Sequence, residues 1–119
     1  MTLLLHKIFQ TEFQAILYII YQEDAENSAG LRALHKAAHF AYLEQHRDIL
    51  VLGGAMLADD GVARTGSVLI LNVADRAAAE HFSANEPLRC AGVFKSVKIT
   101  RMRRGQWNPA AAPATPEGN

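Results

Sequence analysis

The sequence predicts an α+β domain with the ferredoxin-like order β-α-β-β-α-β, in which an antiparallel sheet carries two helices on one face. Two observations predict this fold. Four segments have the β-branched and aromatic composition of strands, and two segments between them repeat their apolar residues at the spacing of a helix. The length of 119 residues suits one domain of this kind.

The chain begins with residues 1–11, which we expect to form an N-terminal extension to a domain spanning residues 12–106. The first strand is predicted over residues 13–22, because this segment is rich in Ile, Tyr and Phe. Both of its alternating faces are apolar in the middle. A strand with this pattern is covered on both sides of its sheet.

The first helix is predicted over residues 31–47, after a polar loop in which Asn27 or Ser28 provides the N-cap. Two neighbouring stripes of side chains run along this helix. The more apolar stripe consists of Leu31, Leu34, Ala38, Ala41 and Gln45, and the more polar one of Arg32, His35, His39 and Leu43. We expect the more apolar stripe to face the core.

The second and third strands are predicted over residues 49–57 and 66–73, with turn-forming residues 58–61 between them. The pair Gly53-Gly54 inside the second strand is typical of a bulge, or of a close approach by backbone or ligand. The third strand is again apolar on both faces.

The second helix is predicted over residues 76–84, with Asp75 as its cap and a proline at position 87 beyond its end. A single helical turn over residues 88–92 leads into the last strand, residues 93–102. This strand alternates apolar and basic side chains, as an edge strand does.

The last segment, residues 107–119, is expected to form a flexible or extended tail. Three prolines in residues 109–119 are incompatible with a long helix or a central strand.

The predicted sheet has consequences for assembly. Two helices cover only one of its faces, and the middle strands are apolar on both. Monomeric proteins rarely expose a large apolar patch. We therefore expect a two-fold homodimer whose sheets pack face to face, with a higher oligomer as an alternative.

Charge and composition exclude several classes of protein. Twelve basic residues balance twelve acidic ones, which argues against nucleic acid as the partner. The longest apolar run, residues 15–21, is far shorter than the ~20 residues of a membrane span, and no secretory signal is evident, so we expect a cytoplasmic protein without a membrane partner. The single cysteine, Cys90, allows no intrachain disulfide and is expected to be a small buried residue.

Several short motifs occur in a fixed order along the chain. They are Arg32-x6-His39, Ala41-Tyr42-Leu43, Gly53-Gly54, Gly61-x4-Gly66-Ser67, Glu86-Pro87-Leu88 and Ala91-Gly92-Val93-Phe94. In this set, from about residue 13 to residue 104, the chain resembles the YCII-related family of the dimeric α+β barrel group. The resemblance implies a small dimer with a pocket between sheet and helix, and some family members resemble enzymes of aromatic degradation.

The resemblance also implies a catalytic dyad of His39 with Glu86. The chain departs from the family pattern at three positions: Glu86 stands where the family has aspartate, Leu88 where it has an aromatic residue, and Ala55 where it has proline. A carboxylate that holds an imidazole fixes its tautomer and raises its basicity, which suits general acid–base catalysis.

The remaining candidate residues would bind the ligand. Arg32 is a candidate contact for a substrate carboxylate or phenolate, and the further candidates are His35, Gly54 and Ser67. We expect a small organic ligand and no cofactor. If the protein is an enzyme, it catalyses proton transfer, isomerisation or elimination on a carbonyl or phenolic substrate.

Two alternatives stay open. The first is a non-catalytic ligand-binding or accessory module with a vestigial dyad. The second is a metal site, because His35 and His39 lie four residues apart on the predicted helix and Glu86 or His81 could supply a third ligand. We expect no metal.

Overall fold

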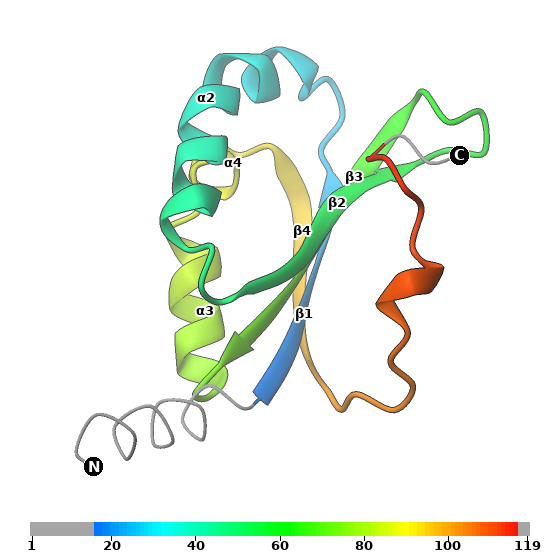
Figure 1. The fold of residues 1–119 in the computed structure, drawn as a ribbon. Coiled ribbons are helices and arrows are strands. Elements are labelled where there is room, and N and C mark those ends of the chain that lie inside the picture. The colour runs from blue at the N-terminus through cyan, green and yellow to red at the C-terminus, as the bar shows by residue number, and fades with distance from the viewer. Residues whose placement is uncertain (1–15, 117–119) are drawn as a thin grey trace.

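A computed structural model describes residues 16–116, and Figure 1 shows an antiparallel sheet with its helices on one side. Its elements are β1 (Ile16–Asp24), α2 (Ala29–Gln45), β2 (Leu50–Leu57), β3 (Arg64–Val73), α3 (Arg76–Ala84), α4 (Pro87–Cys90), β4 (Phe94–Met102) and a 3-10 turn (Pro109–Ala111). The predicted α+β ferredoxin-like fold is confirmed. The expected N-terminal extension, residues 1–11, lies outside the described residues.

The four strands lie in the order β2-β3-β1-β4, and every neighbouring pair is antiparallel. β1 is central, so Ile20 pairs with Leu69 on β3 and with Ile99 on β4. The strand continues to Asp24, two residues beyond the predicted end. This extra length carries Asp24 to the end of the sheet where α2 begins.

The hydrophobic core lies between the sheet and the helices. Its buried members come from β1, β3 and α3 and are Tyr18, Ile20, Leu69, Leu71, Val73, Ala79 and Phe82. They alternate along each strand because successive side chains of a strand point to opposite faces. Asp75 caps α3 as predicted, since its carboxylate accepts the backbone N–H of Ala78 at 2.8 Å.

The predicted core face of the first helix is wrong. Leu31 and Leu34, on the stripe expected to face the core, are 41% and 75% exposed. The neighbouring stripe of Arg32, His35, His39 and Leu43 is half-buried instead, and α2 has no fully buried residue. The polar stripe faces inward because the first half of α2 borders a cavity rather than a packed core.

The helix begins at Ala29, two residues before its predicted start. Ser28 occupies the N-cap position, but its side chain makes no capping hydrogen bond. Asn27, the other expected cap, has a φ of +58° and belongs to the turn that precedes the helix.

The glycines of the motifs differ in their packing in the sheet. A Cβ on Gly66 would lie 2.0 Å from the backbone oxygen of Gln22, so only glycine fits there. The irregularities of the β2–β3 ladder fall between Leu50 and Leu52 and between Met56 and Leu57, on either side of the predicted position at the glycine pair. A Cβ on Gly54 would meet no atom within 4 Å.

The face of the sheet that carries no helix is largely apolar, and we call it the outer face. Its apolar members are Leu17, Ile19, Tyr21, Leu52, Val68, Ile70 and Met102. Among them Leu52 is 64% and Tyr21 43% exposed. Both faces of β1 and β3 are therefore apolar, as expected from the sequence.

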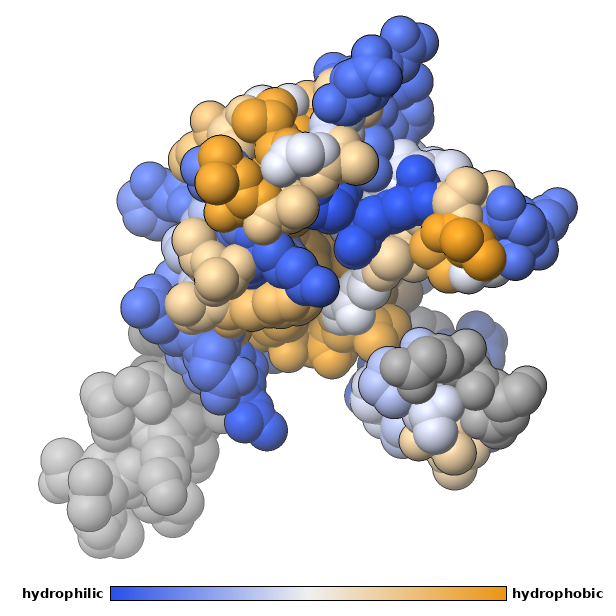
Figure 2. All heavy atoms as spheres, turned by 90° about the horizontal axis from the view of Figure 1, so that it is seen from above, coloured by the Kyte–Doolittle hydropathy of each residue, from blue (hydrophilic) through white to orange (hydrophobic). Residues whose placement is uncertain are grey.

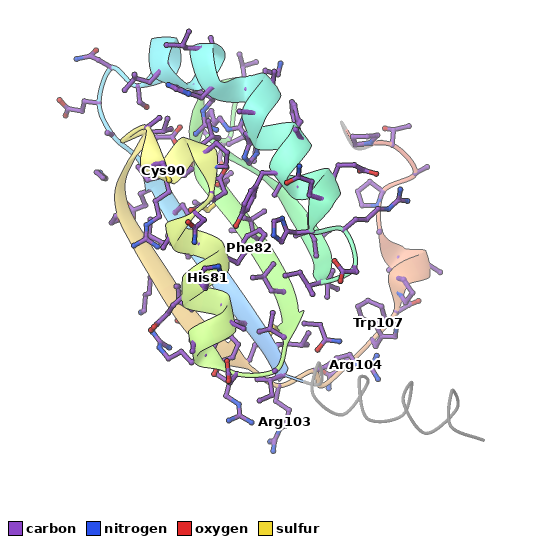
Figure 3. All side chains as sticks on the ribbon, turned by 90° about the vertical axis from the view of Figure 1, so that its left-hand side faces the viewer. His81, Phe82, Cys90, Arg103, Arg104 and Trp107 are labelled. Carbon is purple, nitrogen blue, oxygen red and sulfur yellow. The ribbon has the colours of Figure 1, made fainter. Side chains whose placement is uncertain are left out.

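The C-terminal segment, described to residue 116, lies on the same side of the sheet as the outer face (Figure 1). All of its described residues from position 103 are exposed. The guanidinium of Arg104 lies 5.3 Å from the centre of the Trp107 ring, and the two residues are close together in Figure 3.

Two further expectations concern single features. Cys90 is exposed at the end of α4 (Figure 3), and its thiol faces the backbone oxygen of Ala84 at 3.2 Å, so the prediction of a buried cysteine is wrong. The reason is that α4 buries Leu88 and turns the side chain of Cys90 outward. Among the described residues, none of the helices has the length and apolarity needed to cross a membrane.

Candidate active site

A cavity of about 480 Å³ lies between the first half of α2 and the end of the sheet. Its walls come from the end of β1, the loop that follows, the first turns of α2, the start of β3 and α4. Figure 2 views the molecule from this end and shows hydrophilic side chains beside apolar ones around a hollow. The cavity therefore offers an apolar body and several charged groups to a ligand.

His39 and Glu86 meet at this cavity. His39 projects from the middle of α2, and its Nδ1 hydrogen-bonds to Oε1 of Glu86. The side chains are 13% and 1% exposed, respectively, so the contact is shielded from water. An ionised Glu86 accepts a hydrogen bond from the Nδ1–H group of His39. In this tautomer Nε2 of His39 is the basic nitrogen.

Glu86 is also held by the backbone of α4. Its Oε1 accepts the N–H of Leu88 at 3.1 Å and its Oε2 the N–H of Arg89 at 3.2 Å. Glu86 is thus the N-cap of α4, and Pro87 follows it as the first helical residue. These donors fix the carboxylate in place and satisfy it in a buried position.

Tyr42 lies one turn after His39 on α2, and the charge of Glu86 affects the pKa of its hydroxyl. Its hydroxyl donates to the backbone oxygen of Phe82 at 2.8 Å, which joins α2 to α3. Burial raises the pKa of Tyr42, and the charges of Glu86 and Cys90 raise it further. Tyr42 is therefore a neutral structural donor next to the dyad.

Arg32 lines the cavity but is already paired. Its Nη2 donates to Oδ1 of Asp24 at 2.5 Å, and the side chains are 13% and 14% exposed. Its guanidinium carbon also lies 5.6 Å from the centre of the Phe94 ring. The ion pair joins α2 to the end of β1 and neutralises the charge of Arg32.

Arg64, Lys36 and Phe40 also line the cavity, and the sequence analysis did not single them out. Arg64 opens β3, two residues before Gly66, between the predicted turn over residues 58–61 and the predicted start of the third strand at residue 66. A basic residue within the motif Gly61-x4-Gly66-Ser67 was the available signal. Lys36 lies one turn from both Arg32 and His39 on the helix, and that spacing also pointed to the site.

The structure does not bring the other candidate residues to the cavity. Ser67 is buried in the sheet, where its hydroxyl accepts Nε2 of Gln22 at 2.8 Å. Gly54 lies on β2, and His35 is half-buried on α2. None of the three is among the described residues that line the cavity.

The metal site considered for His35 and His39 finds no support in the described part of the chain. Within residues 16–116, no group of three or more His, Cys, Asp and Glu side chains is arranged to hold a metal ion. His81 projects from α3 and is exposed (Figure 3), where it contacts Asn85.

Comparisons with known proteins give a family match and matches to solved structures. Residues 16–103 match the model of the YCII-related domain. The structure is similar to that of 5-chloro-2-hydroxyhydroquinone dehydrochlorinase (TftG) from Burkholderia phenoliruptrix AC1100 in complex with 2,5-dihydroxybenzoquinone, with a TM-score of 0.67 and 33% identity. The alignment covers 75% of this chain and 95% of the dehydrochlorinase.

A second solved structure is more distant. PA3566 from Pseudomonas aeruginosa is 18% identical with a TM-score of 0.49, over 78% of this chain and 96% of its own. No match is found among curated proteins.

Proposed function

Because this chain belongs to the YCII-related domain family, we propose that it is an enzyme that moves protons on a small phenolic or carbonyl compound with side chains alone. The observation that supports this most directly is the contact between His39 and Glu86 at the wall of the cavity. A buried carboxylate that orients an imidazole is the usual arrangement for a general base near neutral pH. The similarity to a dehydrochlorinase is consistent with such chemistry.

The proposed reaction begins at Nε2 of His39. This nitrogen takes a proton from a phenolic O–H or from a carbon next to a carbonyl, and Glu86 stabilises the imidazolium that forms. In an isomerisation the same imidazolium returns the proton to a different atom. In an elimination the leaving group departs with its bonding electron pair, so the loss of proton and chloride from a chlorinated hydroxyhydroquinone balances without an oxidant.

The test is turnover of 5-chloro-2-hydroxyhydroquinone, followed as chloride release, together with solvent deuterium exchange into a panel of phenols and keto acids. We expect His39→Gln to lower the rate by about 100-fold or more, since general acid–base catalysis contributes 10²–10⁴-fold. His81→Gln, on the exposed side of α3, is the matched control and should keep the wild-type rate. Equal rates for wild type and His39→Gln on every compound would exclude the proposed acid–base catalysis by His39.

One observation favours the alternative of a non-catalytic ligand-binding module. The hydrogen bonds from Leu88 and Arg89 to Glu86 give this carboxylate a structural role that needs no catalysis. In that case the cavity binds its ligand, and the ligand leaves unchanged from wild type and from His39→Gln alike.

The same proposal includes a homodimer formed through the outer face. Its apolar residues on β1 and β3 lie on the face of the sheet that no helix of the described chain covers. Burial of such an apolar surface is the main driving force for protein association. A second copy presents the same patch, as two-fold symmetry requires.

A further inference from the structure

The charges around the cavity do not cancel. Three cationic side chains line it, Arg32, Lys36 and Arg64, against one carboxylate on the same wall, Asp24. That carboxylate is taken by Arg32 at 2.5 Å. Glu86 is not among the described residues that line the cavity, and its carboxylate is hydrogen-bonded to His39. The cavity is therefore positive at the end where β3 begins.

Arg64 is the cavity's guanidinium that keeps its hydrogen-bonding capacity. The one hydrogen bond of its side chain in the described chain runs from Nε to the backbone oxygen of Gly66 at a long 3.5 Å, and no described carboxylate forms an ion pair with it. Both of its terminal nitrogens thus remain available to a ligand. Lys36 likewise pairs with no described carboxylate, and its Nζ lies 5.8 Å from the centre of the Phe40 ring. It differs from Arg64 because an ammonium is a point charge and lacks the planar fork that holds a carboxylate by two parallel hydrogen bonds.

The surroundings of Arg64 favour an anion beside it. Arg64 is exposed as a residue, but partial desolvation of its guanidinium and the nearby charge of Arg32 lower its pKa, while the charge of Asp24 opposes this effect. A guanidinium stays protonated at neutral pH in spite of such a shift. A positive charge in this situation is stabilised by an anionic ligand.

We propose that Arg64 binds a carboxylate of the ligand, so that the substrate class is a one-ring aromatic acid whose hydroxyl or carbonyl group faces His39. This inference rests on the proposed function and narrows it. The planar fork of a guanidinium donates two parallel hydrogen bonds to a carboxylate. The apolar wall of Ala29, Ala33, Phe40 and Leu88 suits a ring, and about 480 Å³ lies in the range of small-molecule sites.

The role of Arg32 changes accordingly. The sequence made Arg32 the candidate for an anionic substrate group, but its pairing with Asp24 leaves Arg64 as the stronger candidate. Arg32 then positions the wall of the cavity by joining α2 to β1.

The experiment compares 2,5-dihydroxybenzoate with hydroquinone, which lacks the carboxylate, by calorimetric titration of the full chain. We expect wild type to bind the acid about tenfold more tightly, since a hydrogen-bonded charged pair contributes on this scale. Arg64→Met, which keeps the length of the side chain, should remove this preference and leave the Kd of hydroquinone unchanged. Arg64→Lys should retain part of the preference.

Arg76→Met is the control, because Arg76 pairs with Glu80 on the exposed side of α3 and should affect neither ligand. A tenfold preference that persists in Arg64→Met would overturn the inference, as would equal binding of both compounds by wild type. In either case the proposed enzyme would stand if His39→Gln still abolished turnover. Absence of binding of both compounds to wild type would overturn the aromatic-acid class itself.

Discussion

His39 of α2 and Glu86 at the start of α4 are 47 residues apart in the chain and hydrogen-bonded in the fold. The carboxylate that orients the imidazole also accepts two backbone N–H groups of α4. The position of the proposed base therefore depends on how α4 is docked. A substitution of Glu86 should therefore lower both the stability of the protein and its turnover.

We expect Glu86→Gln to lower the free energy of unfolding by about 1–3 kcal/mol, because the amide nitrogen would face a buried N–H donor. Turnover should fall at least tenfold, since the neutral amide stabilises an imidazolium poorly. Glu86→Asp keeps the charge and should retain more of both properties. Urea denaturation and turnover measure the two effects.

The control for this pair is Glu80→Gln, whose carboxylate is exposed and pairs with Arg76. Its effect on stability should stay within about 0.5 kcal/mol. Wild-type stability and wild-type turnover in Glu86→Gln would contradict the dual role of Glu86.

Substitution by alanine should have different effects on stability at two glycines of neighbouring strands. Gly66→Ala places a Cβ 2.0 Å from the backbone oxygen of Gln22 and should destabilise the protein by about 2 kcal/mol or more. Gly54→Ala meets open space and should stay within about 0.5 kcal/mol of wild type. Thermal unfolding distinguishes them, and equal melting temperatures would contradict the packing described for Gly66.

The same pair tests the ligand role predicted for Gly54. Because Gly54 lies outside the described cavity lining, Gly54→Ala should bind 2,5-dihydroxybenzoate with the wild-type Kd. A Kd raised tenfold or more would restore Gly54 to the binding site.

Tyr42 should make stability depend on pH at the alkaline end. The folded protein holds the phenolic proton to a pH above 10.0, the ordinary pKa, because Tyr42 is partly buried near Glu86. Above that pH the unfolded chain binds fewer protons than the folded one, so the free energy of unfolding falls as pH rises. Tyr42→Phe should flatten this fall.

The measurement is the urea midpoint of wild type and Tyr42→Phe between pH 8 and pH 11.5. Below pH 9 the variant should be less stable by about 1 kcal/mol, since the backbone oxygen of Phe82 loses its donor. Parallel curves over the whole range would show that Tyr42 titrates normally.

If the proposed dimer forms through the outer face, a glutamate introduced there should have a different effect from a glutamate introduced on the opposite side of the molecule. Ile70→Glu places a charge on the outer face and should convert the dimer to a monomer in light scattering. Leu34→Glu, on the exposed side of α2, should leave the dimer intact. A wild type that is monomeric at high concentration would remove the dimer from the proposal.

Much of the fold could be predicted from the sequence because the strands are long apolar runs separated by turn residues. The segments around Ile20 and Leu69 are buried on one face and apolar on the other, and their short length and their β-branched and aromatic composition favour a strand over a buried helix. The N-cap at Asp75 could also be predicted, because aspartate is strongly preferred at the position just before a helix, where its carboxylate accepts a backbone N–H.

The orientation of α2 could not be predicted in this way. Hydrophobicity selects the stripe with Leu34, but the side that faces the sheet carries His39 and Arg32 because it borders a cavity. A periodicity argument assumes that inward positions are apolar, and that assumption fails at a polar site.

The candidate site divides in the same manner. His39 and Glu86 were found through the family motif, and their hydrogen bond follows from the approach of α2 to α4. Arg64 and Asp24 were missed because each lies at a strand end, where position in the cavity depends on where the strand stops.

The inverted orientation of α2 also bears on how a ligand enters. The helix has no fully buried residue, and its first half is fastened through Arg32 to Asp24 and through His39 to Glu86. Its second half is anchored by Tyr42 and Leu43 against the core. Among the described residues, the first half of α2 contributes nothing to this core or to the apolar side chains packed against it. The amides of the first two turns of α2 should therefore exchange with solvent through local opening, and the cavity should open at that end while the sheet stays closed.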